Sequence, residues 1–265
     1  MRKRVTIIAL CLVCILIIGL VGLGLLFSKF YQHEKWQNEQ IHDLTDKIEK
    51  LANKVEYADN AYNYLAIGNS ITRHGLADYW WDEVGMAATK ADNDYVHLVV
   101  DYLKDTYGDV CYYAINFCTW ENQEHDRAET HYILDTYLST KLDLVTIQLS
   151  ENVSDITTFK TDFEALINYI HDNAPNADIY IIGDFWDSGE KELMKIEAAT
   201  DIGVPFISLD KIKGNPEYQC GIGTIVYDAK GNEHVVEHNG VASHPSDKGM
   251  KYIADAIIER LKTFE

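Results

Sequence analysis

The chain has 265 residues, of which 47% are hydrophobic and 25% are charged, and its formal net charge at pH 7 is −19. This length suits one globular domain with an additional segment. Sequence-independent binding to nucleic acid needs a cationic surface that releases counterions from the phosphates, so we expect no nucleic-acid partner. The same charge disfavours a polyanionic substrate held by bulk electrostatics and favours a soluble domain.

The N-terminus combines a basic tip with a long apolar run. Arg2, Lys3 and Arg4 precede residues 5–27, which carry no charge. A helix rising about 1.5 Å per residue over this length spans the roughly 30 Å hydrocarbon layer of a membrane. The run has no small-x-small cleavage site, which favours an anchor over a cleaved signal peptide. We therefore predict a cytoplasmic tip and transmembrane anchor over residues 1–30, with the remaining chain outside the cytoplasm as a single-pass protein of the cell membrane.

A short apolar stripe follows the anchor. Its members recur at alternating steps of three and four: Ile41, Leu44, Ile48, Leu51 and Val55. This spacing is typical of a helix with one apolar face, and it predicts a helical stalk over residues 31–58. Such a stalk either makes a homodimer and lifts the domain off the membrane, or packs as a helix on the domain itself.

Residues 59–265 alternate between short apolar runs and longer amphipathic ones, which is typical of βα units around a parallel sheet. The expected strands are 62–68, 110–117, 142–149, 179–183 and 205–209. The expected helices are 92–107, 121–138, 157–173, 190–202 and 246–261. A hairpin is expected over 224–236.

Polar segments lie after two of these strands and before the last helix. They are Gly68-Asn69-Ser70-Ile71-Thr72, Gln148-Leu149-Ser150-Glu151-Asn152 and Ser243-His244-Pro245-Ser246-Asp247-Lys248-Gly249. Ligands of open α/β sheets bind at the carboxyl ends of the strands, where such segments converge. Taken alone, Ser70 and Asn152 could cap helices and His244 could end a loop.

Together the segments resemble blocks I, III and V of the SGNH/GDSL hydrolase superfamily, in the family's order and across most of residues 60–262. Ser70 matches the nucleophile of the G-D/N-S-I/L-T motif, and His244 matches the base of the H-P-x-x-x-G motif. Asn152 matches the oxyanion donor of the G-x-N motif, in which Ser150 replaces the glycine. The resemblance implies an α/β fold of three layers, with a flavodoxin-like, doubly wound sheet of about five parallel strands.

Acyl transfer explains why these residue types occur together. A serine hydroxyl is a weak nucleophile until an imidazole takes its proton, and the tetrahedral intermediate needs N–H donors at its oxyanion. We expect the backbone N–H of Ser70 and the side chain of Asn152 to be those donors. The chemistry requires no metal and no organic cofactor.

The sequence departs from the family in the third catalytic member. Val241 stands three residues before His244, where the family has an aspartate. The imidazole is therefore expected to be oriented by a backbone carbonyl or by a carboxylate from elsewhere. Candidate carboxylates are Asp247, Glu121 and Asp184.

A second departure concerns the block II glycine, which has no clear counterpart in residues 115–121; Asn116 lies in its region. Nearby aromatic residues Tyr79, Trp80 and Trp81 are either a stacking platform for a sugar or part of the core. The cysteines after the anchor show neither a disulfide framework nor zinc spacing, although one bridge from Cys220 is compatible with the sequence.

The sequence thus predicts an extracytoplasmic serine esterase that hydrolyses an acyl ester, most simply acetyl, on a polysaccharide or an acylated small molecule. One alternative is an O-acyltransferase acting on a glycan, because the same fold transfers acyl groups. Another is a catalytically weak, glycan-binding pseudoenzyme, because the aspartate and the block II glycine are missing.

Overall fold

The structure is a computed structural model that describes residues 28–37, 41 and 54–263. The chain divides into two compact units, residues 1–54 and 55–265. In the first unit, residues 28–37 and 41 are helical. Most of the predicted anchor and stalk, and with them the stalk dimer, lie outside the described residues. Within the described ranges, no helix has both the length and the apolar character needed to cross a membrane.

The second unit is built on a sheet of five parallel strands in the order β2-β1-β3-β4-β5. The strands are β1 (Tyr62–Gly68), β2 (Val110–Asn116), β3 (Leu144–Gln148), β4 (Asp178–Ile182) and β5 (Phe206–Ile207). The chain passes from β1 to β2 on one side and then to β3 on the other. Strand order therefore reverses between β1 and β3, which is where ligands of such sheets bind. The predicted doubly wound parallel sheet is confirmed.

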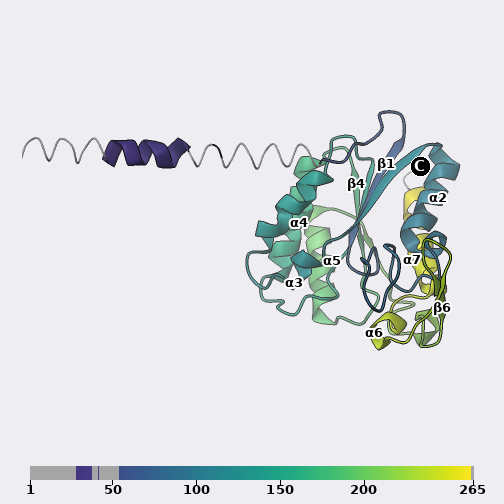
Figure 1. The fold of residues 1–265 in the computed structure, drawn as a ribbon. Coiled ribbons are helices and arrows are strands. Elements are labelled where there is room, and N and C mark those ends of the chain that lie inside the picture. Colours follow the sequence, from purple (N-terminus) through teal and green to yellow (C-terminus); the bar gives the residue numbers. More distant parts are fainter. Residues whose placement is uncertain (1–27, 38–40, 42–53, 264–265) are drawn as a thin grey trace, which may run out of the picture. The chain divides into compact units, whose positions relative to one another are not determined.

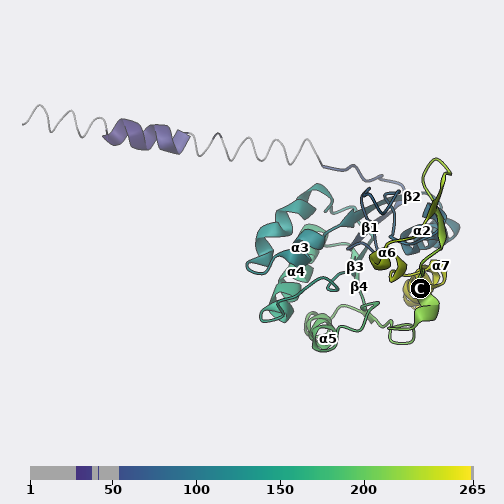
Figure 2. The same ribbon diagram turned by 60° about the horizontal axis from the view of Figure 1, so that its bottom comes forward.

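Helices cover both faces of the sheet, giving three layers (Figures 1 and 2). On one face lie α2 (Tyr95–Tyr107) and α7 (Asp247–Lys262). On the other lie α3 (Cys118–Asn122), α4 (Phe159–Asn173) and α5 (Glu190–Ile202).

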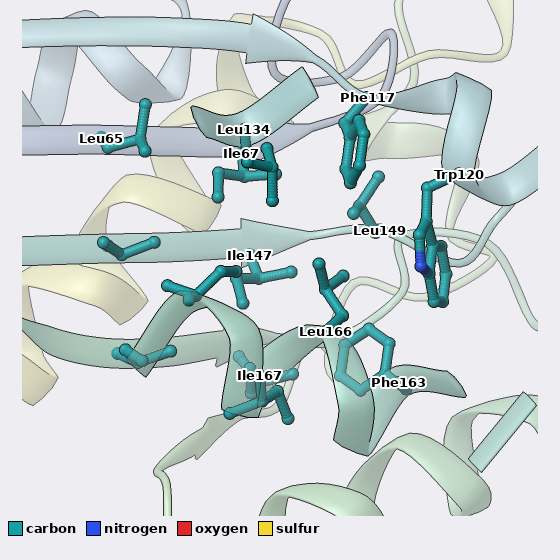
Figure 3. Packing of buried hydrophobic residues seen from close by; sticks show 14 of the residues in the cluster. Leu65, Ile67, Phe117, Trp120, Leu134, Ile147, Leu149, Phe163, Leu166 and Ile167 are labelled. Carbon is teal, nitrogen blue, oxygen red and sulfur yellow. The ribbon is translucent and has the colours of Figure 1, made fainter. Parts of the chain in front are cut away.

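Successive residues of β1 serve different cores, because side chains alternate between the two faces of a strand. Leu65 and Ile67 join the core under α4, which Figure 3 shows with Phe163 of that helix. Tyr64 and Ala66 join the core under α2 and α7. Because β1 is buried on both faces, it reads as a nearly continuous apolar run, and this is why its predicted bounds match the structure.

Two predicted helices differ from the structure for local reasons. The segment 121–138 is divided into α3 and the 3-10 helix η2 (Arg127–Thr136), because Asp126 between them has a left-handed φ of 55°. The helix expected from residue 92 begins at Tyr95, after the short 3-10 helix η1 (Ala91–Asn93). Its start is set by Asp94, whose carboxylate accepts a hydrogen bond from the His97 N–H.

The chain enters the compact unit slightly before the predicted boundary at residue 59. Val55, expected in the helical stripe, lies outside any helix, and its N–H donates to the Thr136 carbonyl at 2.9 Å. Tyr57 is 5% exposed and belongs to the core under α4. These residues pack on the domain.

A third, smaller core lies beside the sheet. The predicted hairpin is present as β6 (Ile225–Tyr227) and β7 (Glu233–Val235), preceded by the 3-10 helix η3 (Pro216–Tyr218). The short helix α6 (Asn239–Ala242), which the sequence does not predict, follows it. Buried apolar residues join these elements to the loop after β1: Trp80, Val84, Met86, Val226, Val236 and Val241.

The glycine that ends β1 is required by close packing. A Cβ at Gly68 would lie 1.8 Å from the Thr72 hydroxyl and 2.8 Å from the Gln148 carbonyl oxygen. We expect Gly68→Ala to lower the free energy of unfolding by about 1–3 kcal/mol through overpacking, measured by urea denaturation. Gly75→Ala is the control, because a Cβ there meets nothing within 4 Å. Equal stability of the two variants would contradict this reason for the glycine.

Candidate active site

Ser70 lies in the turn that follows β1, at the carboxyl end of the strand and beside the point where strand order reverses. The turn is shaped by Asn69, whose side-chain oxygen accepts a hydrogen bond from the Ile71 N–H at 3.0 Å and whose carbonyl accepts one from the Arg73 N–H at 3.0 Å. Ser70 itself is partly exposed. Among the described residues, its backbone N–H donates to no protein acceptor and is therefore available to a ligand.

His244 reaches Ser70 from the loop between α6 and α7. Its Nε2 lies 2.7 Å from the Ser70 Oγ, and its Nδ1 lies 2.6 Å from the Gly240 carbonyl oxygen. A carbonyl can only accept, so Nδ1 carries the hydrogen, and in the neutral ring Nε2 is the acceptor of the serine hydroxyl. The structure thus brings the predicted nucleophile and base together in the tautomer that general-base catalysis needs.

Burial sets the protonation state of this histidine. The His244 side chain is 9% exposed, and burial lowers its pKa from 6.5 to about 4. The hydrogen bond to the Gly240 carbonyl opposes this shift, whereas the neighbouring His74 and His238 add to it. At neutral pH the ring is therefore uncharged and able to accept a proton.

Trp186, on the loop after β4, holds the histidine from the side. Its indole N–H donates to the Ser243 carbonyl at 3.0 Å. Its ring meets the His244 ring edge to face, with centroids 4.9 Å apart and planes at 83°. The only signal for this contact in the sequence is the position of Trp186 just after a strand.

The carboxylates proposed as third catalytic member have other partners. Asp247 accepts hydrogen bonds from the N–H and the hydroxyl of Thr89, at 2.7 and 2.6 Å. Asp184 pairs with Lys195 at 2.7 Å, in full burial. Glu121, the remaining candidate, bonds to residues of the β1 and β3 loops. The backbone carbonyl, which was the alternative to a carboxylate, is what orients the imidazole.

At position 241, where the SGNH/GDSL family has an aspartate, this chain has a buried valine. Val241 is 1% exposed and belongs to the third core. The neighbouring Gly240 supplies its carbonyl instead, and this carbonyl also accepts the Ser243 hydroxyl at 2.8 Å.

Asn152, the predicted oxyanion donor, is exposed on the loop after β3. One of its amide hydrogens is directed at the Glu121 carboxylate, with nitrogen and oxygen 2.6 Å apart. The second hydrogen remains for a ligand, because a side-chain amide has two N–H donors. Asn116, the other candidate, donates to the Arg73 carbonyl at 2.8 Å and accepts from the Cys118 N–H at 3.0 Å, so it shapes the adjoining loops.

A buried polar layer supports these loops, and the sequence gives little sign of it. Ser150 Oγ donates to the Asp184 carboxylate at 2.5 Å, and Lys195 donates to the Leu149 carbonyl at 2.6 Å. Burial would raise the pKa of Asp184, but the charge and hydrogen bond of Lys195 hold it below its usual range. Burial and the charge of Asp184 raise the pKa of Glu151 to about 7.

The predicted aromatic platform is present only in part. Trp80 is 2% exposed and is a core residue. Tyr79 and Trp81 are accessible, and each stacks on an imidazole: Tyr79 on His238 with centroids 4.6 Å apart, and Trp81 on His234 at 4.4 Å. We call these four side chains the aromatic and imidazole rim; its Tyr79–His238 pair neighbours His244, because His238 is one of the imidazoles that lower the pKa of His244.

The described cysteines form no disulfide. Cys111, Cys118 and Cys220 are all free thiols, so the bridge that the sequence allowed is not formed. In the described ranges, no group of three or more histidine, cysteine or acidic side chains is arranged to hold a metal ion.

No protein-family model matches the sequence, and no curated protein matches it. Among solved structures, a family two carbohydrate esterase from Clostridium thermocellum, in complex with cellohexaose, matches with a TM-score of 0.51 at 15% identity. The match covers 79% of this chain and 66% of that one. A two-domain esterase active on acetylated mannans matches with a TM-score of 0.49 at 20% identity, over 83% of this chain and 52% of that one.

A putative GDSL-like lipase from Parabacteroides merdae matches with a TM-score of 0.49 at 15% identity, over 78% of this chain and 97% of that one. The present chain spans about half the length of the two-domain esterase. The match to the Clostridium thermocellum esterase shows that the chain shares the fold of that carbohydrate esterase.

The buried histidine sets a pH dependence for the reactivity of Ser70. The hydroxyl is activated only while the imidazole is uncharged, so reaction should be fast above the pKa of His244 and slow below it. With that pKa at about 4, we expect the rate of Ser70 labelling by a fluorophosphonate probe to rise with a midpoint near pH 4 and stay level to neutrality. His244→Asn should label slowly without this midpoint. A midpoint near 6.5 in the unmodified protein would contradict the expected effect of burial.

Proposed function

We propose that the protein is a carboxylic ester hydrolase in which Ser70 attacks the ester carbonyl and His244 is the general base. The substrate is a carbohydrate that carries a small acyl group, most simply acetyl. One observation carries the proposal: the Ser70 hydroxyl and the His244 Nε2 lie 2.7 Å apart at the reversal point of the sheet. A serine and a neutral imidazole in hydrogen-bond contact, with the imidazole anchored from behind, are the parts that acyl transfer needs.

The reaction proceeds in two halves. His244 Nε2 takes the Ser70 proton while Oγ bonds to the ester carbonyl carbon, and the resulting oxyanion is held by the Ser70 N–H and the Asn152 amide. The imidazolium then gives its Nε2 proton to the leaving alcohol, which forms an acyl-serine. Nε2 then takes a proton from a water molecule, whose oxygen attacks the acyl carbon, and returns that proton to Oγ as the acyl–oxygen bond breaks, which releases the carboxylic acid and free Ser70. Throughout, the second ring hydrogen stays on Nδ1, which donates it to the Gly240 carbonyl.

The rim beside His244 supports a carbohydrate as the alcohol part of the ester. Tyr79 and Trp81 offer ring faces for the apolar faces of a sugar, and His238 offers ring nitrogens for its hydroxyl groups, whereas the Nε2 of His234 is bonded to Asp228 at 3.2 Å. The carbohydrate esterase from Clostridium thermocellum, whose structure contains cellohexaose, is consistent with this class of ligand.

Replacing the nucleophile tests the mechanism. We expect Ser70→Ala to lower kcat for p-nitrophenyl acetate and acetylated xylan by at least about a thousandfold, because only binding and oxyanion stabilisation remain. The assay uses the full chain in detergent and follows nitrophenol and acetate release. The exposed Ser154 provides a control, Ser154→Ala, that should retain activity. Unchanged hydrolysis by Ser70→Ala would refute the mechanism, and transfer to an added alcohol that outruns hydrolysis would indicate an acyltransferase.

We further propose that the catalytic domain lies outside the cytoplasm, tethered to the cell membrane by residues 5–27. The uncharged run and the basic residues ahead of it support this arrangement. Proteinase added to intact cells should digest the domain while a cytoplasmic control protein survives. Protection of the domain until the membrane is opened would contradict the proposed topology.

A further inference from the structure

Glu121 is a buried carboxylate that the mechanism above does not use. It lies in α3, which follows β2, and it is 1% exposed. Taking a carboxylate out of water is costly unless its oxygens find strong partners. In the described structure no cation pairs with it. Its partners are N–H donors from two other loops at the same edge of the sheet.

Four donors converge on this carboxylate. Oε1 accepts the Ser150 N–H at 2.6 Å, the Asn69 amide at 3.1 Å and the Asn152 N–H at 3.4 Å. Oε2 accepts the Asn152 side-chain amide at 2.6 Å. Each carboxylate oxygen has two lone pairs, so three donors share those of Oε1, and the Asn152 N–H makes the longest of these contacts. They tie the loop after β1 to the loop after β3.

Both loops carry groups that act on the ester. Asn69 precedes the nucleophile and shapes its turn, while Asn152 carries the side-chain oxyanion donor. Ser150, two residues before Asn152, has a φ of 127°, a conformation that favours glycine and is strained for serine. Its N–H is held by Glu121 and its hydroxyl by Asp184, and these two bonds stabilise the strained backbone.

From this geometry we propose that Glu121 is a positioning residue that fixes the Asn152 amide, and with it the oxyanion site, relative to Ser70. The inference rests on the proposed esterase function. The segment after β2 lacks the glycine whose N–H usually completes the oxyanion site in the SGNH/GDSL family. In this chain the segment would instead contribute to that site through the side chain of Glu121. Fixing the donor before the reaction spares the cost of orienting it when the oxyanion forms.

The variant Glu121→Gln separates this role from a merely structural one. Its amide oxygen can replace Oε1 and keep the Ser150 N–H, while its NH₂ group replaces Oε2 and faces the Asn152 amide, donor to donor. We expect kcat for p-nitrophenyl acetate to fall about 10- to 100-fold with KM changed by less than about threefold, because the oxyanion exists only in the reaction.

A double-mutant cycle identifies the partner. Asn152→Ala removes the donor, so in that background Glu121→Gln should cost less than about a further threefold in kcat. Asp94→Asn is the control: Asp94 is also 1% exposed and accepts backbone N–H groups of Gly85 and His97. It should lose stability and keep kcat.

The possible results distinguish failure of the positioning role of Glu121 from failure of the proposed esterase function. If the wild-type protein hydrolyses the ester and labels at Ser70, but the losses from Glu121→Gln and Asn152→Ala simply multiply, the positioning role is refuted and the esterase stands. A kcat in Glu121→Gln equal to that of Asp94→Asn refutes it as well. A wild-type protein that neither hydrolyses esters nor labels at Ser70 overturns the proposed function, and the positioning role with it.

Discussion

The hydrogen bond from His244 Nδ1 to the Gly240 carbonyl is the contact on which the site depends. It fixes the tautomer in which Nε2 can accept a proton, and in the proposed mechanism it substitutes for the carboxylate found in many serine hydrolases. A carbonyl dipole stabilises an imidazolium less than a full negative charge does. The pKa of the buried His244 ring is low for the same reason, because its partner is a neutral carbonyl and no anion counters the desolvation. The site therefore combines a weak base with a proton-accepting form that persists into mildly acidic solution.

No carboxylate contacts His244 in the described structure, but three carboxylates lie under the loops after β1 and β3. Glu121, Glu151 and Asp184 accept hydrogen bonds from backbone and amide groups there, and Lys195 supplies a buried positive charge. Such a layer is stabilising only when its members are satisfied, since a buried polar group without a partner is expensive. The loops are thus held by hydrogen bonds where the apolar cores end.

Sequence patterns predict the features that depend on local composition. The bounds of β1 follow from an apolar run, and Ser70 and His244 follow from short motifs on recognisable elements. The break at Asp126 depends on one backbone angle, which no periodicity records. The carbonyl of Gly240 is equally invisible, because every residue has a carbonyl and only the fold selects one. Glu121 was expected among the carboxylates near the site, but its partners could be found only in three dimensions.

The base and the nucleophile belong to different packing units. Ser70 follows a central strand buried between two large cores, whereas His244 follows the small core that the β6–β7 hairpin and α6 form with part of the loop after β1. Backbone hydrogen bonds from Cys220 to His244 and from Gly221 to Ala242 fasten that small unit to itself. Parts of a protein with few buried contacts open more readily than the whole. In the proposed mechanism, the residue that accepts the proton is thus carried by the smaller packing unit, and we expect heating to separate His244 from Ser70 before the sheet unfolds.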